Sequence, residues 1–212
     1  EKMAALNLQI DECKGDLLIK ALDLHNSRQK VIPRLEKQIK EILVGLNFNQ
    51  AQFEIKLTSS ETFTDKGNDQ IQFLFSGNPG VAVARLSKVA SGGELSRVML
   101  ALKAIMATTQ NLPSIIFDEI DTGVSGETAG KIAEILKNMG NDMQVIAISH
   151  LPQIASKGLH HYKVEKKADK NSSKTLIYEL SKEERIQELS RLLSGEKISE
   201  TALKNAQELL YS

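Results

Sequence analysis

Residues 115–119 read Ile-Ile-Phe-Asp-Glu, a short apolar run that stops at two adjacent acids. A second run of this kind, Val-Ile-Ala-Ile at 145–148, stops at Ser149 and His150. Such runs are typical of parallel strands that are buried on both faces. Between them the apolar residues recur at a helical spacing, at Ile132, Ile135, Leu136 and Met139. The order of strand, helix and strand predicts a right-handed crossover unit and therefore an α/β fold.

The segments around this unit extend the mixed pattern. Apolar and polar residues alternate over 53–57 and over 71–75, on the two sides of a turn at Gly67-Asn68, which predicts two strands. The other expected elements are a helix from 95 to 106, a hairpin formed by 162–165 and 175–180, and two terminal helices around 186–193 and 202–210. Together they predict a parallel sheet flanked by helices.

The N-terminal segment carries a narrow apolar stripe at steps of three and four residues. Its members are Leu6, Ile10, Cys13, Leu17, Leu24 and Val31. So narrow a stripe indicates a helix that meets one partner helix, with Cys13 buried in the seam as a small apolar residue. Pro33 is expected to end or kink this helix, and a second amphipathic stretch follows to Leu46. The pattern leaves open whether this is an ordinary surface helix pair or the arm of a coiled coil.

Composition and charge narrow the class of protein. The 212 residues are 41% hydrophobic and 25% charged, as in an average soluble domain, and 27 basic residues balance 27 acidic ones. A protein that holds nucleic acid through its global field would be basic, so DNA contacts would have to come from a local patch. One cysteine and four histidines exclude a disulfide framework and fit a reducing, cytoplasmic compartment. The most apolar stretch, 98–107, is interrupted by Lys103 and is too short to span a membrane.

Three ionisable residues follow the two predicted parallel strands. Asp118 and Glu119 come after the first strand and His150 comes after the second, so all three are expected at one edge of the sheet, where ligands bind in such folds. The first carboxylate suits a hydrated Mg²⁺ ion, and the second suits the orientation or deprotonation of an attacking water. The alternative is two solvated acids that open a loop, with a histidine that is hydrogen-bonded locally.

A second candidate site lies just before the helix that begins near residue 95. Ser91-Gly92-Gly93-Glu94 offers free backbone N–H groups, a hydroxyl and two glycines that let an anion approach closely. This arrangement favours phosphate binding, although a flexible turn with a serine near a helix start gives the same pattern.

The chain lacks the phosphate-binding loop that these groups would serve. The segment Gly126-Glu127-Thr128-Ala129-Gly130-Lys131 resembles one, but only three residues separate its glycines and Ile132 stands where a hydroxyl is needed. Lys131 is better explained as a surface residue on a helix. We therefore expect the missing loop to come from another polypeptide or from a further part of a longer chain.

In this order, the motifs resemble the C-terminal lobe of an ABC-type ATPase head of the SMC-like kind. Residues 91–94 are similar to the signature motif, 115–119 to the Walker B strand, Asp121 with its following turn to the D-loop, and His150 to the switch histidine. The segments 78–80, 89–97, 117–126 and 149–153 resemble the RecN family of bacterial recombination and repair proteins most closely, over a stretch from about Phe53 onwards. Ala90 departs from the leucine of the usual signature, as in the RecN-like form.

The resemblance implies a composite ATP site that forms when two copies of the head associate. Ser91 and the amides of Gly92 and Gly93 would reach the γ-phosphate held by the opposite copy, and Glu94 is counted with them among the nucleotide-binding residues. Asp118 would support Mg²⁺, Glu119 would activate water, Asp121 would lie at the dimer seam, and His150 would lie near the γ-phosphate.

The implied partners are an N-terminal P-loop lobe of the same protein, a second copy and DNA, with no membrane, in a cytoplasmic, nucleoid-associated setting. Residues 1–44 would be the coiled-coil arm end and connecting helix, and 45–212 the C-terminal lobe. The implied role is ATP-gated head association during double-strand-break repair.

Two other classes of function remain open from the residues alone. A self-contained Mg²⁺-dependent phosphohydrolase would use Asp118, Glu119, Asp121 and His150, but the sequence shows no second cluster of acids to complete a metal cage. A non-enzymatic coiled-coil adaptor would leave the serine-glycine loop and the acidic strand end without a use.

Overall fold

The computed structural model describes residues 2–89, 92–118, 120–121, 123–124, 126–169, 172–195 and 197–211. The chain forms two compact units, residues 1–101 and 102–212, and each is described by itself. The boundary falls within α2 (Gly92–Thr109), whose first turns belong to the first unit.

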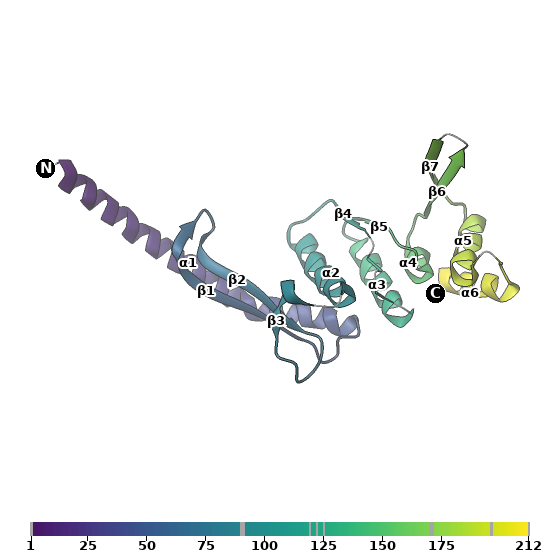
Figure 1. The fold of residues 1–212 in the computed structure, drawn as a ribbon, viewed down its shortest axis with the longest axis horizontal. Coiled ribbons are helices and arrows are strands. Elements are labelled where there is room, and N and C mark those ends of the chain that lie inside the picture. The colour runs from purple at the N-terminus through teal and green to yellow at the C-terminus, as the bar shows by residue number, and fades with distance from the viewer. Residues whose placement is uncertain are drawn as a thin grey trace. The chain divides into compact units, whose positions relative to one another are not determined.

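The first unit combines one long helix with an antiparallel hairpin (Figure 1). Its elements are α1 (Lys2–Gly45), β1 (Gln52–Thr64), β2 (Gly67–Ser76), the short β3 (Ala84–Arg85) and the 3₁₀ turn η1 (Leu86–Lys88). β1 and β2 pair from Gln52↔Ser76 to Thr64↔Gly67, and Gly67 has the positive φ of 91° that closes the turn. The two strands predicted from alternation are confirmed.

α1 does not end at Pro33, so that part of the sequence prediction is wrong. A proline inside a helix removes one backbone hydrogen bond and crowds the preceding turn. Here the helix is held to the hairpin on both sides of the proline. Arg28 donates to Asp69 Oδ2 at 2.8 Å before it, and Glu36 Oε1 accepts from the backbone N–H of Ile55 at 2.7 Å after it. These tertiary contacts outweigh the local preference of the proline.

A buried carboxylate joins α1 to β2. The side chain of Asp69 is 1% exposed, and its two oxygens lie 2.6 Å from His25 Nδ1 and 2.8 Å from Arg28. Arg28 also donates to the carbonyl of Lys66 at 2.7 Å. Burial opposes ionisation of Asp69, but the hydrogen bonds and charges of His25 and Arg28 outweigh it and lower the pKa of Asp69. The second half of α1 is therefore fastened to the hairpin by polar contacts as well as by apolar packing.

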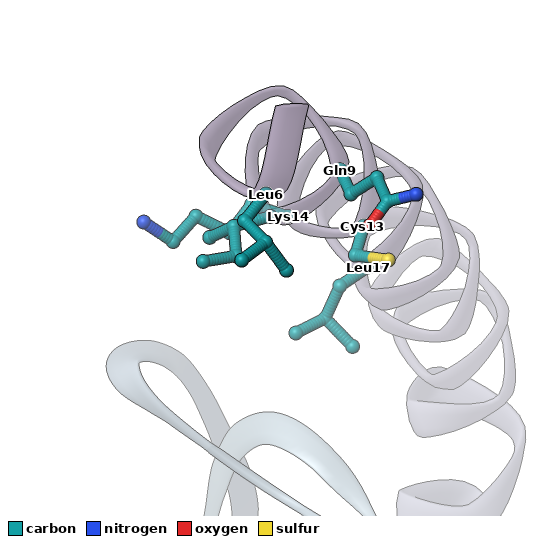
Figure 2. Close-up of a pocket in the computed structure, with 6 residues that line it drawn as sticks. Leu6, Gln9, Cys13, Lys14 and Leu17 are labelled. Carbon is teal, nitrogen blue, oxygen red and sulfur yellow. The ribbon is translucent and has the colours of Figure 1, made fainter. Parts of the chain in front are cut away.

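The first half of α1 leaves its apolar stripe open to solvent. Leu6, Ile10 and Leu17 are exposed, and with Gln9, Cys13 and Lys14 they line a shallow groove along one face of the helix (Figure 2). Cys13 is exposed and not buried as its place in the seam predicts, because no other described residue covers this face of α1. An open stripe of this spacing is what a partner helix would cover.

The second unit contains the predicted crossover. β4 (Ser114–Phe117) and β5 (Gln144–Ala147) pair in parallel from Ser114↔Gln144 to Phe117↔Ala147, and α3 (Gly126–Met139) connects them. The buried face of α3 consists of Ala129, Ile132, Ala133, Leu136 and Met139. The α/β prediction is confirmed in this parallel strand–helix–strand unit.

The expectation that both faces of these strands are buried is wrong for the described chain. Phe117 is buried, but its neighbour Ile116 is 60% exposed and Ile146, its partner across the ladder, is 43% exposed. Side chains alternate along a strand, so these two isoleucines lie on the same face. Parallel sheets in known folds are generally covered on both faces, so the exposure of this face departs from the usual arrangement.

The rest of the second unit follows β5. It consists of α4 (Pro152–Lys157), the hairpin of β6 (Tyr162–Asp169) and β7 (Ser172–Glu179), α5 (Lys182–Ser194) and α6 (Glu200–Tyr211). The hairpin and the terminal helices confirm the sequence prediction. Ser181 caps α5 in a reciprocal pair with Glu184, in which each side chain accepts from the other's backbone N–H. In the described ranges, every helix is too short or too polar to cross a bilayer.

Candidate functional site

The edge formed by the carboxyl ends of β4 and β5 carries the predicted acids and the histidine. The two strands end side by side. The N–H of Ile148, just after β5, donates to the carbonyl of Phe117, the last residue of β4, at 2.8 Å. Asp118 follows β4 directly and is exposed, and His150 stands three residues beyond β5 with its side chain 76% exposed. Glu119 lies outside the described residues. The fold therefore brings Asp118 and His150 to one edge of the parallel pair, as the strand order predicts.

Asp121 ties the two strand ends together. Its Oδ2 accepts a hydrogen bond from Ser149 Oγ at 2.5 Å and from the backbone N–H of His150 at 2.8 Å. The same oxygen lies 2.9 Å from His150 Nδ1. The carboxylate itself is buried. The loop after β4 thus fixes the position of the loop after β5, and with it the position of the His150 ring.

The electrostatics of Asp121 favour its ionised form. Burial by itself would raise the pKa of this carboxyl, but the hydrogen bonds from Ser149 and from the backbone of His150 outweigh burial and lower the pKa of Asp121. The charge is then available to orient the imidazole, which is the role that a buried carboxylate plays beside a functional histidine.

Ser149 is a site residue to which the sequence alone assigned no role. Its hydroxyl donates to Asp121 and accepts from the backbone N–H of Leu151 at 3.0 Å, one residue before α4 begins. A serine that accepts from the N–H two residues later forms a turn of its own. The sequence does carry a signal for this role: a serine stands directly before the histidine, at the end of the apolar run 145–148.

The other candidate motif lies at the start of α2, in the first unit. Gly92 opens the helix and Glu94 stands in its first turn, so the first N–H groups of α2 lack partners within the helix. A Cβ at Gly92 would meet no atom within 4 Å, so the packing of this chain alone does not explain the glycine. Ser91 lies outside the described residues. The N-terminus of a helix, with a glycine that admits close approach of a ligand, is suited to an anion.

Two further features bear on the chemistry. Lys131, in the segment that resembles a P-loop, forms an ion pair with Glu127 at 3.0 Å, one turn earlier on α3, as a surface helix residue would. Within the described ranges, no three histidine, cysteine, aspartate or glutamate side chains are grouped closely enough to hold a metal ion by themselves.

The fold of the chain is similar to that of solved SMC head domains. No family model matches the sequence. A solved chain from work on ATP-driven dimerization and DNA-stimulated activation of SMC ATPases aligns with a TM-score of 0.54 and 18% identity, over 82% of this chain and 99% of that one. The Smc head domain with a coiled coil and joint from Pyrococcus yayanosii gives a TM-score of 0.58 and 20% identity, over 77% of this chain and 29% of that one. These likenesses define the fold class.

Relatives at the sequence level are more specific. The DNA repair protein RecN of Vibrio cholerae is 40% identical over 100% of this chain and 38% of its own length, and RecN of Rickettsia conorii is 45% identical over 90% and 35%. RecN of Halalkalibacterium halodurans is 37% identical over 99% of the chain and 38% of its own length. The chain belongs, as a C-terminal part, to the RecN family of DNA repair proteins. It spans little more than a third of the length of these relatives.

Proposed function

We propose that the chain is the C-terminal ATPase lobe of a RecN-like protein of double-strand-break repair and recombination. The observation that carries the proposal is the Asp121–Ser149–His150 contact at the carboxyl edge of a parallel strand pair, in a chain that has no phosphate-binding loop of its own. A site with a fixed histidine and an acidic strand end, but without a loop to hold phosphates, is half of a nucleotide site.

The missing half is proposed to be an N-terminal P-loop lobe of the same protein. Support comes from the exposed isoleucines of β4 and β5, which leave a parallel sheet uncovered on one face. A lobe that brings its own strands would cover this face and bring the phosphate-binding loop to the carboxyl edge. In this proposal residues 1–44 are the coiled-coil arm end and connecting helix, and 45–212 are the lobe itself.

The proposed roles follow the chemistry of each group. Asp118 is exposed at the strand end and would hold Mg²⁺, the charge of which would stabilise the phosphates of ATP. Glu119 would accept a proton from the attacking water, and His150, held by Asp121, would donate to the γ-phosphate oxygens. Ser91, Gly92 and Gly93 would bind the γ-phosphate of ATP that a second copy holds.

The cellular role is proposed from the family. RecN relatives are named as DNA repair proteins, so DNA is the proposed partner beyond the second copy. We place the protein in the cytoplasm, associated with the nucleoid, for the same reason. Of the rival functions, the self-contained phosphohydrolase gains no support, since the described residues offer no metal cage.

The test uses the chain with and without the N-terminal part of its own full-length protein. The purified chain alone is expected to show no steady ATP turnover, and addition of the P-loop part is expected to restore it. In the reassembled protein Glu119→Gln should bind ATP but stall with the heads engaged, because the group that accepts the proton of water is gone. Glu127→Gln, which changes an exposed acid at the start of α3, is the matched control and should turn over ATP normally. Steady turnover by the chain alone would contradict the proposal.

A further inference from the structure

An arginine on the second turn of α2 stacks on an aromatic ring from the turn that follows α1. The Cζ atom of Arg97 lies 4.3 Å from the centroid of the Phe48 ring. Phe48 is 6% exposed and packs edge to face on Phe75 of β2, with ring centroids 5.4 Å apart. A guanidinium over the face of a buried ring is attracted by the ring quadrupole, and the attraction is strongest where water is excluded.

The first turn of α2 is tied to the same place through Glu94. A Cβ built on Gly77, just beyond β2, would come within 2.8 Å of Glu94 Oε1 and 3.4 Å of the Phe48 ring. The carboxylate therefore lies against the backbone of Gly77, where a side chain would displace it. Burial lowers the pKa of Arg97, and the charge of Glu94 acts in the opposite direction, so the two side chains attract each other.

Phe48 is in turn rigidly connected to α1. Its backbone N–H donates to the carbonyl of Leu43 at 2.9 Å, which folds the chain back at the end of the helix. Leu43, which accepts this bond, and Leu46, within the turn that the bond closes, are both buried. The turn after α1, the Phe48 ring and Arg97 of α2 thus form one cluster of contacts within the first unit.

The choice of arginine in this cluster calls for a use beyond packing. Arg97 Nε is buried and finds no hydrogen-bond partner among the described residues. A buried N–H without a partner costs free energy, so an apolar side chain would fill the space at lower cost. The planar guanidinium instead stacks on the Phe48 ring and at the same time attracts the carboxylate of Glu94. An apolar side chain could do only the first.

We propose that Arg97 is a positioning residue that fixes the anion-facing first turn of α2 to the end of α1 through its stack on Phe48. The inference rests on the proposed function, in which this turn meets ATP held by a second copy. Loss of the stack would leave ATP binding at the P-loop side of the same copy intact. It would weaken the engagement of the opposite copy, and with it the rate of turnover.

The experiment compares four variants of the full-length protein: Arg97→Ala, Arg97→Lys, Phe48→Leu and the double variant Phe48→Leu/Arg97→Ala. The matched control is Arg34→Ala, which removes an exposed arginine of α1. For each protein, circular dichroism checks the fold, a fluorescent ATP analogue gives the Kd of the unengaged protein, and steady-state kinetics give kcat and KM.

We expect Arg97→Ala to lower kcat about tenfold, equivalent to about 1.4 kcal/mol, while the Kd of the unengaged protein changes less than twofold. Arg97→Lys should recover part of kcat, because the ammonium retains the charge and part of the attraction to the ring. The loss of kcat in the double variant should be smaller than the combined losses of the two single variants, because both single changes remove the contact between Arg97 and Phe48. Folded Arg97→Ala protein with unchanged kcat, or additive losses in the double variant, would overturn the inference. Failure of the wild-type protein to bind or hydrolyse ATP would instead overturn the proposed function.

Discussion

Two buried carboxylates, Asp121 and Asp69, form hydrogen bonds that hold neighbouring segments of this chain in place. Asp121 is expected from its motif to lie at a dimer seam, yet its Oδ2 already accepts from Ser149 and from the N–H of His150. A carboxylate used in this way positions the backbone and the ring of His150, and any contact that it makes with the proposed second copy has to be added to these bonds. Its loss is therefore expected to affect the fold of the loop as well as nucleotide chemistry.

Asp121→Ala is predicted to lower the free energy of unfolding of the chain by about 1 kcal/mol, because two partly buried donors, Ser149 Oγ and the N–H of His150, lose their acceptor. The measurement is urea denaturation followed by circular dichroism. Asp142→Ala, which removes an exposed aspartate from the turn before β5, serves as the control and should change stability by less than about 0.5 kcal/mol. Equal stability of the two variants would show that the Asp121 bonds contribute nothing net.

Asp69 gives the corresponding prediction in the first unit. Asp69→Ala leaves His25 and Arg28 without their shared partner at a half-buried site, and we expect it to lower the free energy of unfolding by roughly 3 kcal/mol. Asp65→Ala, four residues earlier in the exposed hairpin turn, is the control. Hydrogen exchange at the β1–β2 amides is the local measurement. Unchanged protection of these amides in Asp69→Ala would mean that apolar packing alone holds α1 to the hairpin.

At the scale of helices and strands, the sequence predicted what depends on local periodicity. The crossover of β4, α3 and β5 and the two hairpins follow from spacings within each segment. The continuation of α1 past Pro33 could not be predicted, because it depends on the Arg28–Asp69 pair, which joins residues 41 positions apart. The sequence predicts more burial of the parallel strands than the structure shows. An apolar run of residues does not determine which element packs on each face of the strand.

The candidate site was predicted in outline by the same reasoning. Strand order alone places His150 at the edge where Asp118 follows β4. The hydrogen bonds through Ser149 that fix the histidine follow no spacing rule, since they join loops 28 residues apart. The stack of Arg97 on Phe48 was missed for the same reason.

The open face of the parallel strand pair provides the prediction at this scale. Ile146→Lys adds a charge where the side chain is already exposed, so the free energy of unfolding of the chain alone should change by less than about 0.5 kcal/mol. Binding of the separately purified P-loop part should be lost, because a lysine buried against that part would be left unpaired. A pull-down with the P-loop part measures this, and Asn138→Lys on the exposed side of α3 is the control. Normal binding by Ile146→Lys would mean that the face is covered by something else.

For the whole molecule, the two units offer separate probes of stability. The three tyrosines, Tyr162, Tyr178 and Tyr211, all belong to the second unit, and the sequence contains no tryptophan. Tyrosine fluorescence therefore follows the second unit alone, whereas far-ultraviolet circular dichroism follows both. Each unit has its own buried carboxylates, Asp69 in the first and Asp121 with Glu188 in the second. The chain is thus expected to unfold in steps that the two signals separate.

Acid should weaken the second unit in two stages, and the sign follows from the direction of each pKa shift. Burial and the charge of Arg185 lower the pKa of His161, against the opposing effect of Glu188. The unfolded chain then binds a proton before the folded one does, so stability present above about pH 6.5 is lost as the pH falls through the lower folded pKa. The pKa of Asp121 is also lowered, and its contribution is lost in the same direction below about pH 4.

His161→Phe tests the first of these stages, because phenylalanine fills the half-buried position without a proton to bind. Denaturation by urea at a series of pH values, followed by tyrosine fluorescence, should show a falling stability between pH 7 and pH 5 in the wild-type chain. That fall should be reduced in His161→Phe, and the fall below about pH 4 should remain because Asp121 is unchanged. His160→Phe, at the exposed neighbouring position, is the matched control and should retain the first stage. An identical pH profile in wild-type and His161→Phe protein would show that the buried imidazole is not the group responsible, and that the charges of Arg185 and Glu188 balance at this position.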